Sequence, residues 1–214
     1  VQSAQVLLNN DPYGPSITRN SNGDLIGVTT TYFNEENTEV TGVDFKYDAA
    51  LFSSIEYGEI SLSINATTLI DFLTPALGNE GVSKMINRVG KFNYDTNTHS
   101  LPKNRINAFI NWEYSDYDIN FNTRYIDGYD NQRPINSLGM KYGYDNSVDS
   151  FIVHDLSVKR QIPIHNGEID LKLSIINIFD ESAPRLYDAP DFSFDTRVHD
   201  PRGRIIGISF EYRN

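Results

Sequence analysis

The sequence predicts an all-β protein built from seven long antiparallel strands. In seven runs, apolar and polar residues alternate with a period of two, the pattern of strands whose two faces differ. Most of these runs are about 11 to 13 residues long, whereas strands of soluble sheets usually have roughly 5 to 6 residues. The connections between the runs are alternately short and long along the chain. These three observations indicate one sheet whose two ends are built differently.

The first 37 residues are predicted to form an irregular segment. From Val1 to Leu8 the apolar residues have helical spacing, and residues 9–12 (Asn-Asn-Asp-Pro) end it, which predicts a short helix over residues 1–10. Residues 17–32 hold two β-prone runs around Asn-Ser-Asn-Gly-Asp, which predicts a hairpin. Residues 34–37 form a polar link to the first long strand.

The alternating runs are expected at residues 39–51, 58–69, 103–114, 117–125, 149–162, 168–179 and 202–212. Between the third and fourth runs lie only Ser115 and Asp116, and so short a connection predicts a tight antiparallel hairpin. The long connection 71–102 contains residues 81–88, where we expect one or two turns of helix.

The connection lengths favour a transmembrane barrel over a soluble sandwich. Short turns at the periplasmic end and long external loops are typical of outer-membrane barrels, whereas a sandwich has no reason to separate its loops by length. The strand length also matches a tilted strand that crosses the hydrocarbon of a bilayer. We therefore predict an antiparallel transmembrane β-barrel segment with an apolar outer face and a polar lumen.

Composition agrees with this fold class and excludes others. The chain is 39% hydrophobic with 12% aromatic residues, and its mean hydropathy is −0.44. No stretch approaches the roughly 18 to 20 apolar residues of a membrane helix. The net charge of −11 leaves no basic patch for nucleic acid. The chain has no cysteine, and its four histidines lack the spacing of metal ligands. We expect no catalytic residues, metal or cofactor, because no motif of an enzyme is present.

The alternation assigns residues to the two faces of the predicted barrel. Polar residues at inward positions are expected to line the lumen: Asp44, Lys46, Asn107, Asn111, Asn120, Asn122, Arg124, Asp170 and Lys172. Aromatic residues on the apolar face gather at the short-turn end, which is typical of the girdle at a membrane interface. The girdle residues are Trp112, Tyr114, Tyr117, Phe210 and Tyr212.

Two long connections carry aromatic and charged residues that can hold a polar ligand. The candidates are Tyr129, Arg133, Tyr142, Tyr144, Asp145, Asp188, Asp191 and Phe192. For each residue taken singly, ordinary loop packing or solvation is the simpler interpretation. The acidic residues lack the spacing of a calcium loop.

The last part of the sequence contains two short elements, Asn177-Ile178-Phe179-Asp180 and Asp200-Pro201-Arg202-Gly203-Arg204, and the final strand IIGISFEY follows them. In these elements and their order, it resembles the carboxyl-terminal end of TonB-dependent outer-membrane receptors. Pro201 suits the first residue of a strand, since it cannot donate a ladder hydrogen bond. Gly203 permits a bulge, and the two arginines are interpreted mainly as anchors between loop and rim.

The resemblance implies a transport receptor in the outer membrane of a Gram-negative bacterium. It implies that residues 1–37 belong to an extracellular loop and residues 38–214 to the last third of a 22-stranded barrel without its plug domain. The implied partners are membrane lipid, the plug and remaining strands, TonB with its inner-membrane motor, and a surface lipoprotein. The implied cargo is a siderophore, cobalamin, glycan or peptide. A small complete barrel or a soluble β-sandwich binding module remains the alternative.

Overall fold

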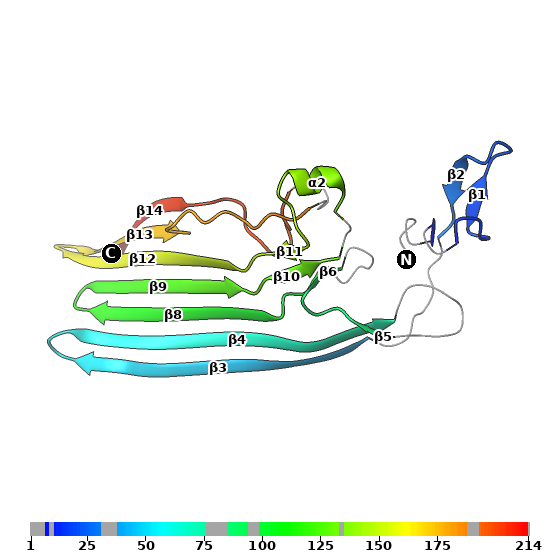
Figure 1. Ribbon diagram of the computed structural model, residues 1–214. Helices are drawn as coiled ribbons and strands as arrows, with labels where there is room; N and C mark the ends of the chain where they lie inside the picture. The colour runs from blue at the N-terminus through cyan, green and yellow to red at the C-terminus, as the bar shows by residue number, and fades with distance from the viewer. Residues whose placement is uncertain are drawn as a thin grey trace.

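The computed structural model describes residues 7–8, 11–30, 38–75, 85–93, 99–132, 135–187 and 193–213. The prediction of an all-β protein with antiparallel sheets is confirmed, as Figure 1 shows. Helix α2, in the second long connection, has only five residues, Ser137–Lys141. Among the described residues, no helix is long and apolar enough to cross a membrane.

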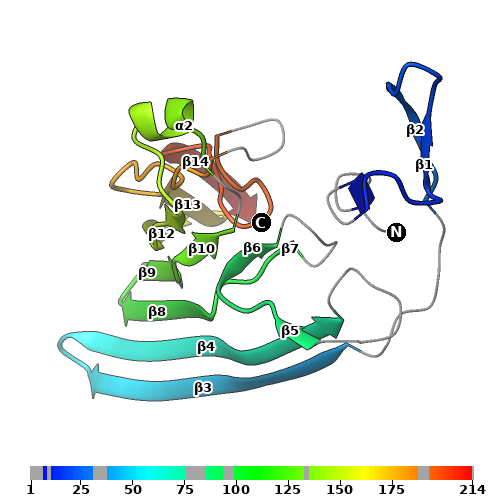
Figure 2. The same ribbon diagram turned by 45° about the vertical axis from the view of Figure 1, so that its right-hand side comes forward.

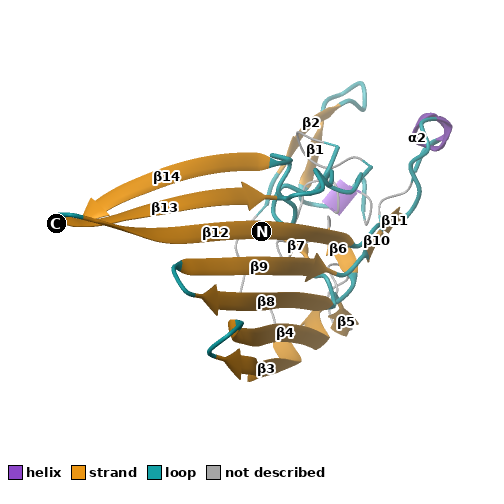
Figure 3. Ribbon diagram, turned by 90° about the vertical axis from the view of Figure 1, so that its left-hand side faces the viewer, coloured by secondary structure: helices purple, strands orange, loops and turns teal. Residues whose placement is uncertain are grey.

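Seven long strands form one antiparallel sheet in the order β14-β13-β12-β9-β8-β4-β3, which can be followed in Figure 3. Short strand β5 (Met85–Asn87) pairs beside them with β4. The sheet is open in the described part of the chain, with β3 and β14 at its edges. The long strands are β3 (Glu39–Ser54), β4 (Gly58–Pro75), β8 (Asn104–Tyr114), β9 (Tyr117–Ile126), β12 (Phe151–Ile164), β13 (Gly167–Ile176) and β14 (Ile205–Arg213).

The register keeps like residues on the same face from strand to strand. Leu62 on β4, for example, lies opposite Ala49 on β3 and Ile110 on β8. The row continues to the far edge through Phe121, Leu156, Ile175 and Ile206. One face of the sheet is therefore apolar across all seven long strands.

The two ends of the sheet differ as the connection lengths predict. The turns 55–57, 115–116 and 165–166 join neighbouring strands at one end, on the left in Figure 1. The connections 76–103, 127–150 and 177–204 all leave from the other end. We refer to these as the turn end and the loop end of the sheet.

At the loop end, a second sheet is assembled from the first two long connections; Figure 1 labels β6, β10 and β11, and Figure 2 labels β7. Its order is β11-β10-β6-β7, and the pair β10-β6 is parallel. The sequence did not predict these pieces, because each has only two or three residues and is held by its neighbours rather than by its own pattern. Their bounds are β6 (Lys91–Asn93), β7 (His99–Ser100), β10 (Tyr129–Asn131) and β11 (Ser147–Val148).

The structure corrects the predicted bounds of several elements. Residues 85–87 form strand β5, so the expectation of helix over 81–88 is wrong there. β13 stops at Ile176 instead of Phe179, because Asn177 has a positive φ of 53° and starts a turn. β14 begins only after Gly203, whose φ is 67°.

The amino-terminal hairpin forms as expected. Strands β1 (Ile17–Arg19) and β2 (Leu25–Val28) pair antiparallel, and the Asn20 side chain accepts hydrogen bonds from the turn amides of Asn22 and Asp24, each at 2.9 Å. Most of the helix expected over residues 1–10 lies outside the described residues, although Leu7 and Leu8 are helical.

Candidate functional site

The three long connections pack against one another through a small apolar core at the loop end. Tyr129 and Val148 come from the second connection and Leu186 from the third, and all three are almost fully buried. Phe92 of the first connection and Val198 of the third pack against them. The loops are therefore one packed unit within the described residues, and not separate excursions.

A buried polar network lies beside this core, centred on the Asp195 carboxylate. The Oδ2 atom accepts hydrogen bonds from the hydroxyls of Ser100 and Tyr129, the latter at 3.1 Å. The Oδ1 atom accepts the backbone N–H of Arg197 at 3.0 Å. Ser100, Tyr129 and Asp195 belong to three different connections, so one carboxylate joins all three.

His199 completes the network. Its Nε2 lies 3.2 Å from the Tyr129 hydroxyl, and the two rings stack with centroids 6.1 Å apart. Because the tyrosine proton is donated to Asp195, the histidine contact requires a proton on Nε2. The other ring nitrogen, Nδ1, is buried and has no hydrogen-bond partner in the described structure.

Burial changes the acid–base behaviour of this network. The pKa of His199 is lowered to about 4, mainly by burial, while the charge of Asp195 opposes this shift and the charge of Arg105 contributes to it. Burial also raises the pKa of the Tyr129 phenol, and the neighbouring Asp195 charge adds to that. His199 is therefore neutral and Tyr129 protonated at neutral pH, the forms that the hydrogen bonds require.

The network covers the polar face of the long sheet at the loop end. The ring of Phe151 packs edge-on against His199, with centroids 5.2 Å apart. Phe151 and Val153 occupy polar-face positions of β12, yet both are buried. Apolar residues thus appear on the polar side where the third connection covers it, which explains why this strand alternates least regularly in the sequence.

The candidate ligand contacts are only partly brought together. The structure places Tyr129 in the core, where its ring takes part in loop packing. Tyr142 is exposed just after α2, whereas Tyr144 packs edge-on against Tyr187 at 5.5 Å. The Asp145 carboxylate accepts two hydrogen bonds from Ser147, which lower its pKa. The remaining candidates, Arg133, Asp188, Asp191 and Phe192, lie outside the described residues.

The expected lumen residues lie on the polar face of the sheet, where several are paired. Asp44 accepts a hydrogen bond of 2.6 Å from Thr67, and Lys46 forms an ion pair of 3.1 Å with Asp48. Arg124 on β9 forms an ion pair of 3.2 Å with Asp155 on the adjacent strand β12. Further lumen positions lie directly opposite one another or pair across strands: Asn107 with Arg124, Asn111 with Asn120, Asn122 with Asp155, Lys159 with Lys172, and Asp170 with both Lys159 and Arg213.

The aromatic residues expected in the girdle lie near the turn end on the apolar face. Tyr114 is opposite Tyr117 in register, and the same transverse row ends at Phe210 on β14. Trp112 stacks on Tyr114 at 6.1 Å and donates a hydrogen bond of 2.8 Å to the Tyr57 carbonyl. The Tyr212 hydroxyl donates to the Asn166 carbonyl at 2.6 Å. These polar tips reach the turns, while the rings stay on the apolar face.

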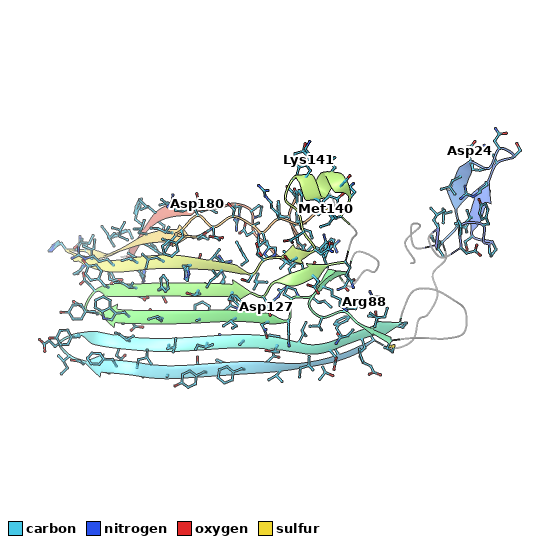
Figure 4. All side chains as sticks on the ribbon, in the orientation of Figure 1. Asp24, Arg88, Asp127, Met140, Lys141 and Asp180 are labelled. Carbon is cyan, nitrogen blue, oxygen red and sulfur yellow. The ribbon has the colours of Figure 1, made fainter. Side chains whose placement is uncertain are left out.

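The two short elements of the last connection contact each other directly. The Asp180 carboxylate accepts the backbone N–H of Arg204 at 2.7 Å, and the Arg204 guanidinium donates to the Ile178 carbonyl at 3.1 Å. The Asn177 amide exchanges two hydrogen bonds with the backbone of Glu181, both at 2.9 Å. Figure 4 labels Asp180 where β13 ends. We call this contact between residues 177–181 and 202–204 the clasp.

The first residues of the second element, Asp200 and Arg202, pair with each other beside the clasp. Arg202 binds Asp200 with three side-chain hydrogen bonds, at 2.9, 3.1 and 2.7 Å, and this pairing lowers the pKa of Asp200 to about 2. Phe179 packs edge-on against His154 of β12 at 5.4 Å. Arg204 thus joins the last connection to the end of β13, whereas the hydrogen bonds described for Arg202 stay within its own element.

Sequence reasoning missed Ser100 and His199, the partners of Asp195 and Tyr129. Their separation along the chain hides the contact, because Ser100 and Asp195 are 95 residues apart. In the described part of the chain, no group of three or more His, Cys, Asp or Glu residues could hold a metal ion.

Comparison with known proteins adds no assignment. A scan against protein-family models finds no match, and a search of curated proteins finds none either.

Proposed function

We propose that the chain is part of a TonB-dependent receptor in the outer membrane of a Gram-negative bacterium. Such a receptor takes up a scarce nutrient (a siderophore, cobalamin, a glycan or a peptide) with energy delivered through TonB. The observation that carries this proposal is the apolar face of the long sheet, which continues from β3 to β14 and is interrupted on β8, β9, β12, β13 and β14 by a single charged residue, Arg160.

The exposure of that face supports a lipid environment. Phe45 on β3, Ile110 on β8 and Leu171 on β13 each leave two fifths or more of their surface uncovered. In water, an apolar patch of this extent would favour association or aggregation. In a bilayer the same side chains contact hydrocarbon, and the strands between β3 and β14 satisfy their backbone through two neighbours. The edge strands β3 and β14 would pair with the remaining strands of the receptor.

The opposite face supports a water-filled lumen. Its ion pairs and amides would be costly against lipid but are normal in a barrel interior. The turn end then corresponds to the periplasmic side and the packed connections to the outside. The lumen residues would contact the plug, and the loop cluster together with the exposed Tyr142 would meet the nutrient or a surface lipoprotein.

The resemblance of the two closing elements to those of TonB-dependent receptors is the reason for proposing transport as the function. The clasp joins the last two strands at the point where the family's two short elements stand. A soluble β-sandwich would need a second layer over the apolar face, and no described element lies there: large side chains on β3, β8, β13 and β14 remain exposed.

Site-directed labelling tests the membrane placement. The chain has no cysteine, so single-cysteine variants can carry an environment-sensitive dye without background. A dye at Ile110 should be quenched by lipids brominated in their acyl chains, whereas a dye at the neighbouring Asn111 should be quenched by aqueous iodide. Equal behaviour of the two positions in liposomes, or a monomeric chain that needs no detergent, would refute the placement.

Uptake assays test the transport function separately. Deleting the gene in its host should abolish growth on one scarce nutrient at limiting concentration. Deleting TonB should give the same defect. Normal growth on siderophores, cobalamin, glycans and peptides in the deletion strain would argue against a receptor even if the chain spans the membrane.

A further inference from the structure

Arg160 is an exception on the apolar face. On β8, β9, β12, β13 and β14, all of whose residues are described, it is the one charged residue at an apolar-face position of the register. It lies opposite Tyr117 on one side and Leu171 on the other. Every other Arg, Lys, Asp and Glu of these strands points to the polar face. A cation in this place requires a reason.

The Arg160 side chain is held by two neighbours at the turn end. Its Nε donates to the Asp116 carboxylate at 2.7 Å, and its guanidinium carbon lies 5.0 Å from the centre of the Tyr117 ring. Asp116 belongs to the two-residue turn between β8 and β9, and its backbone carbonyl accepts the N–H of Gln161 at 2.9 Å. The turn therefore fixes the carboxylate beside the arginine.

Part of this pair remains open to a ligand. The side chains of Arg160 and Asp116 keep 48% and 31% of their surface exposed. Within the described residues, the two terminal nitrogens of Arg160 make no hydrogen bond. The site thus offers N–H donors for an anion next to a carboxylate that can accept further hydrogen bonds.

The surroundings place the pair at the level of lipid headgroups if the sheet spans a bilayer. Arg160 shares its transverse row with Tyr114, Tyr117 and Phe210, the aromatic band near the turn end. An arginine facing lipid costs about 2 to 4 kcal/mol at the bilayer midplane but about 0 to 1 near the interface. A headgroup phosphate at this level would satisfy the free guanidinium donors.

We propose that Arg160 and Asp116 bind the headgroup of a phospholipid that carries both a phosphate and a primary ammonium, the chemistry of phosphatidylethanolamine. The phosphate accepts hydrogen bonds from the terminal nitrogens of Arg160, and the ammonium donates to Asp116. A neutral pair of opposite charges complements a zwitterion better than a simple anion. The site rests on the proposed membrane placement and adds a specific lipid partner to it.

Trp112 supplies a probe beside the site. It is the single tryptophan of the chain and lies on β8, two strands from Arg160, which corresponds to about 10 Å across the sheet. The purified chain is placed in phosphatidylcholine bilayers with a fixed fraction of brominated phosphatidylethanolamine, phosphatidylcholine or phosphatidylglycerol. Quenching of Trp112 then reports which headgroup is enriched beside it.

We expect brominated phosphatidylethanolamine to quench about twice as strongly as brominated phosphatidylcholine, since only the former can donate from its ammonium. The preference should disappear in Arg160→Gln and in Asp116→Asn. Lys172→Gln is the matched control, because it removes the same charge from the polar face, and it should keep the preference. Arg160→Lys should retain only part of it, since lysine lacks the planar fork.

Each other outcome decides against the site. Strong but equal quenching by phosphatidylethanolamine and phosphatidylcholine overturns it and leaves the membrane placement intact. Stronger quenching by phosphatidylglycerol means that Arg160 acts as a lone cation, which overturns the two-group site. Absence of quenching by any brominated lipid removes the membrane placement and the site together.

Discussion

The Tyr129 hydroxyl donates a 3.1 Å hydrogen bond to the carboxylate of Asp195, 66 residues further along the chain. The same oxygen of Asp195 accepts from Ser100. All three side chains are more than nine-tenths buried. A bond of this kind is worth little in water but much where its partners cannot be solvated. It decides whether the three long connections remain one unit.

Asp195→Ala should loosen the loop cluster. It leaves the hydroxyls of Ser100 and Tyr129 buried without their acceptor, which should cost about 2 to 3 kcal/mol. Hydrogen exchange of the β10 and β11 amides should accelerate accordingly, while the long strands keep their protection. Asp145→Ala is the control, since that exposed carboxylate bonds only to Ser147. Equal exchange in both variants would show that the network does not hold the loops.

Acid should weaken the same cluster through His199. Its folded-state pKa of about 4 lies below the roughly 6.5 of an unfolded histidine, so the folded form binds fewer protons between these values. The stabilisation is therefore complete above about pH 6.5 and is lost as the pH falls towards 4, by at most about 3 kcal/mol. Hydrogen exchange of β10 measured across this range tests the sign.

His199→Phe serves as the comparison for the pH experiment. Phenylalanine keeps the ring contacts with Tyr129 and Phe151 but cannot take up a proton. The variant should lose most of the change in loop protection between pH 6.5 and 4. A pH dependence identical to that of the unsubstituted chain would assign the effect to other groups.

Gly203→Ala should open the clasp. Gly203 has a φ of 67°, and a Cβ at this position would lie 2.8 Å from the Asp180 carboxylate. Strained backbone and the displaced carboxylate should together cost about 1 to 3 kcal/mol. Gly207→Ala on the following strand, β14, is the control, because its Cβ would meet nothing within 4 Å. Thermal unfolding in detergent should separate the two variants.

The apolar face should reject a charge much more strongly than the polar face. Ile208 and Ser209 are neighbours on β14 with opposite orientations. Ile208→Lys should cost about 2 to 4 kcal/mol in a bilayer and reduce membrane assembly, whereas Ser209→Lys should be close to neutral. Folding yield into liposomes, read from protease protection, measures the difference. Similar yields would contradict a lipid-facing side at Ile208.

Alternation was enough to predict the long strands, because each strand has one apolar and one polar face and its own sequence shows this as a period of two. The run predicted at 103–114 became Asn104–Tyr114, and the two-residue turn after it formed as expected. Strand ends were less accurate where backbone geometry decides them. The left-handed conformation of Asn177 ends β13 three residues early, and an alternating pattern carries no information about φ.

The loop end could not be predicted for a different reason. Its parallel pair β10-β6 and its Asp195 network depend on contacts between distant segments, and neither has a local pattern. The sequence offered Tyr129 as a candidate ligand contact with ordinary loop packing as the simpler interpretation, and the structure buries its ring in the loop core. The burial of Phe151 and Val153 on the polar side was visible only as irregular alternation, a signal that could have indicated the covering connection.

The carboxylate shared by the three connections also limits how this surface can change. A loop exchanged alone would have to bring its own replacement for Ser100, Tyr129 or Asp195, or leave the others unsatisfied in the interior. Substitutions are therefore accommodated most easily in segments away from the network, such as the exposed end of α2 around Tyr142. The three connections can thus change only together at the network, whereas exposed residues outside it can change singly.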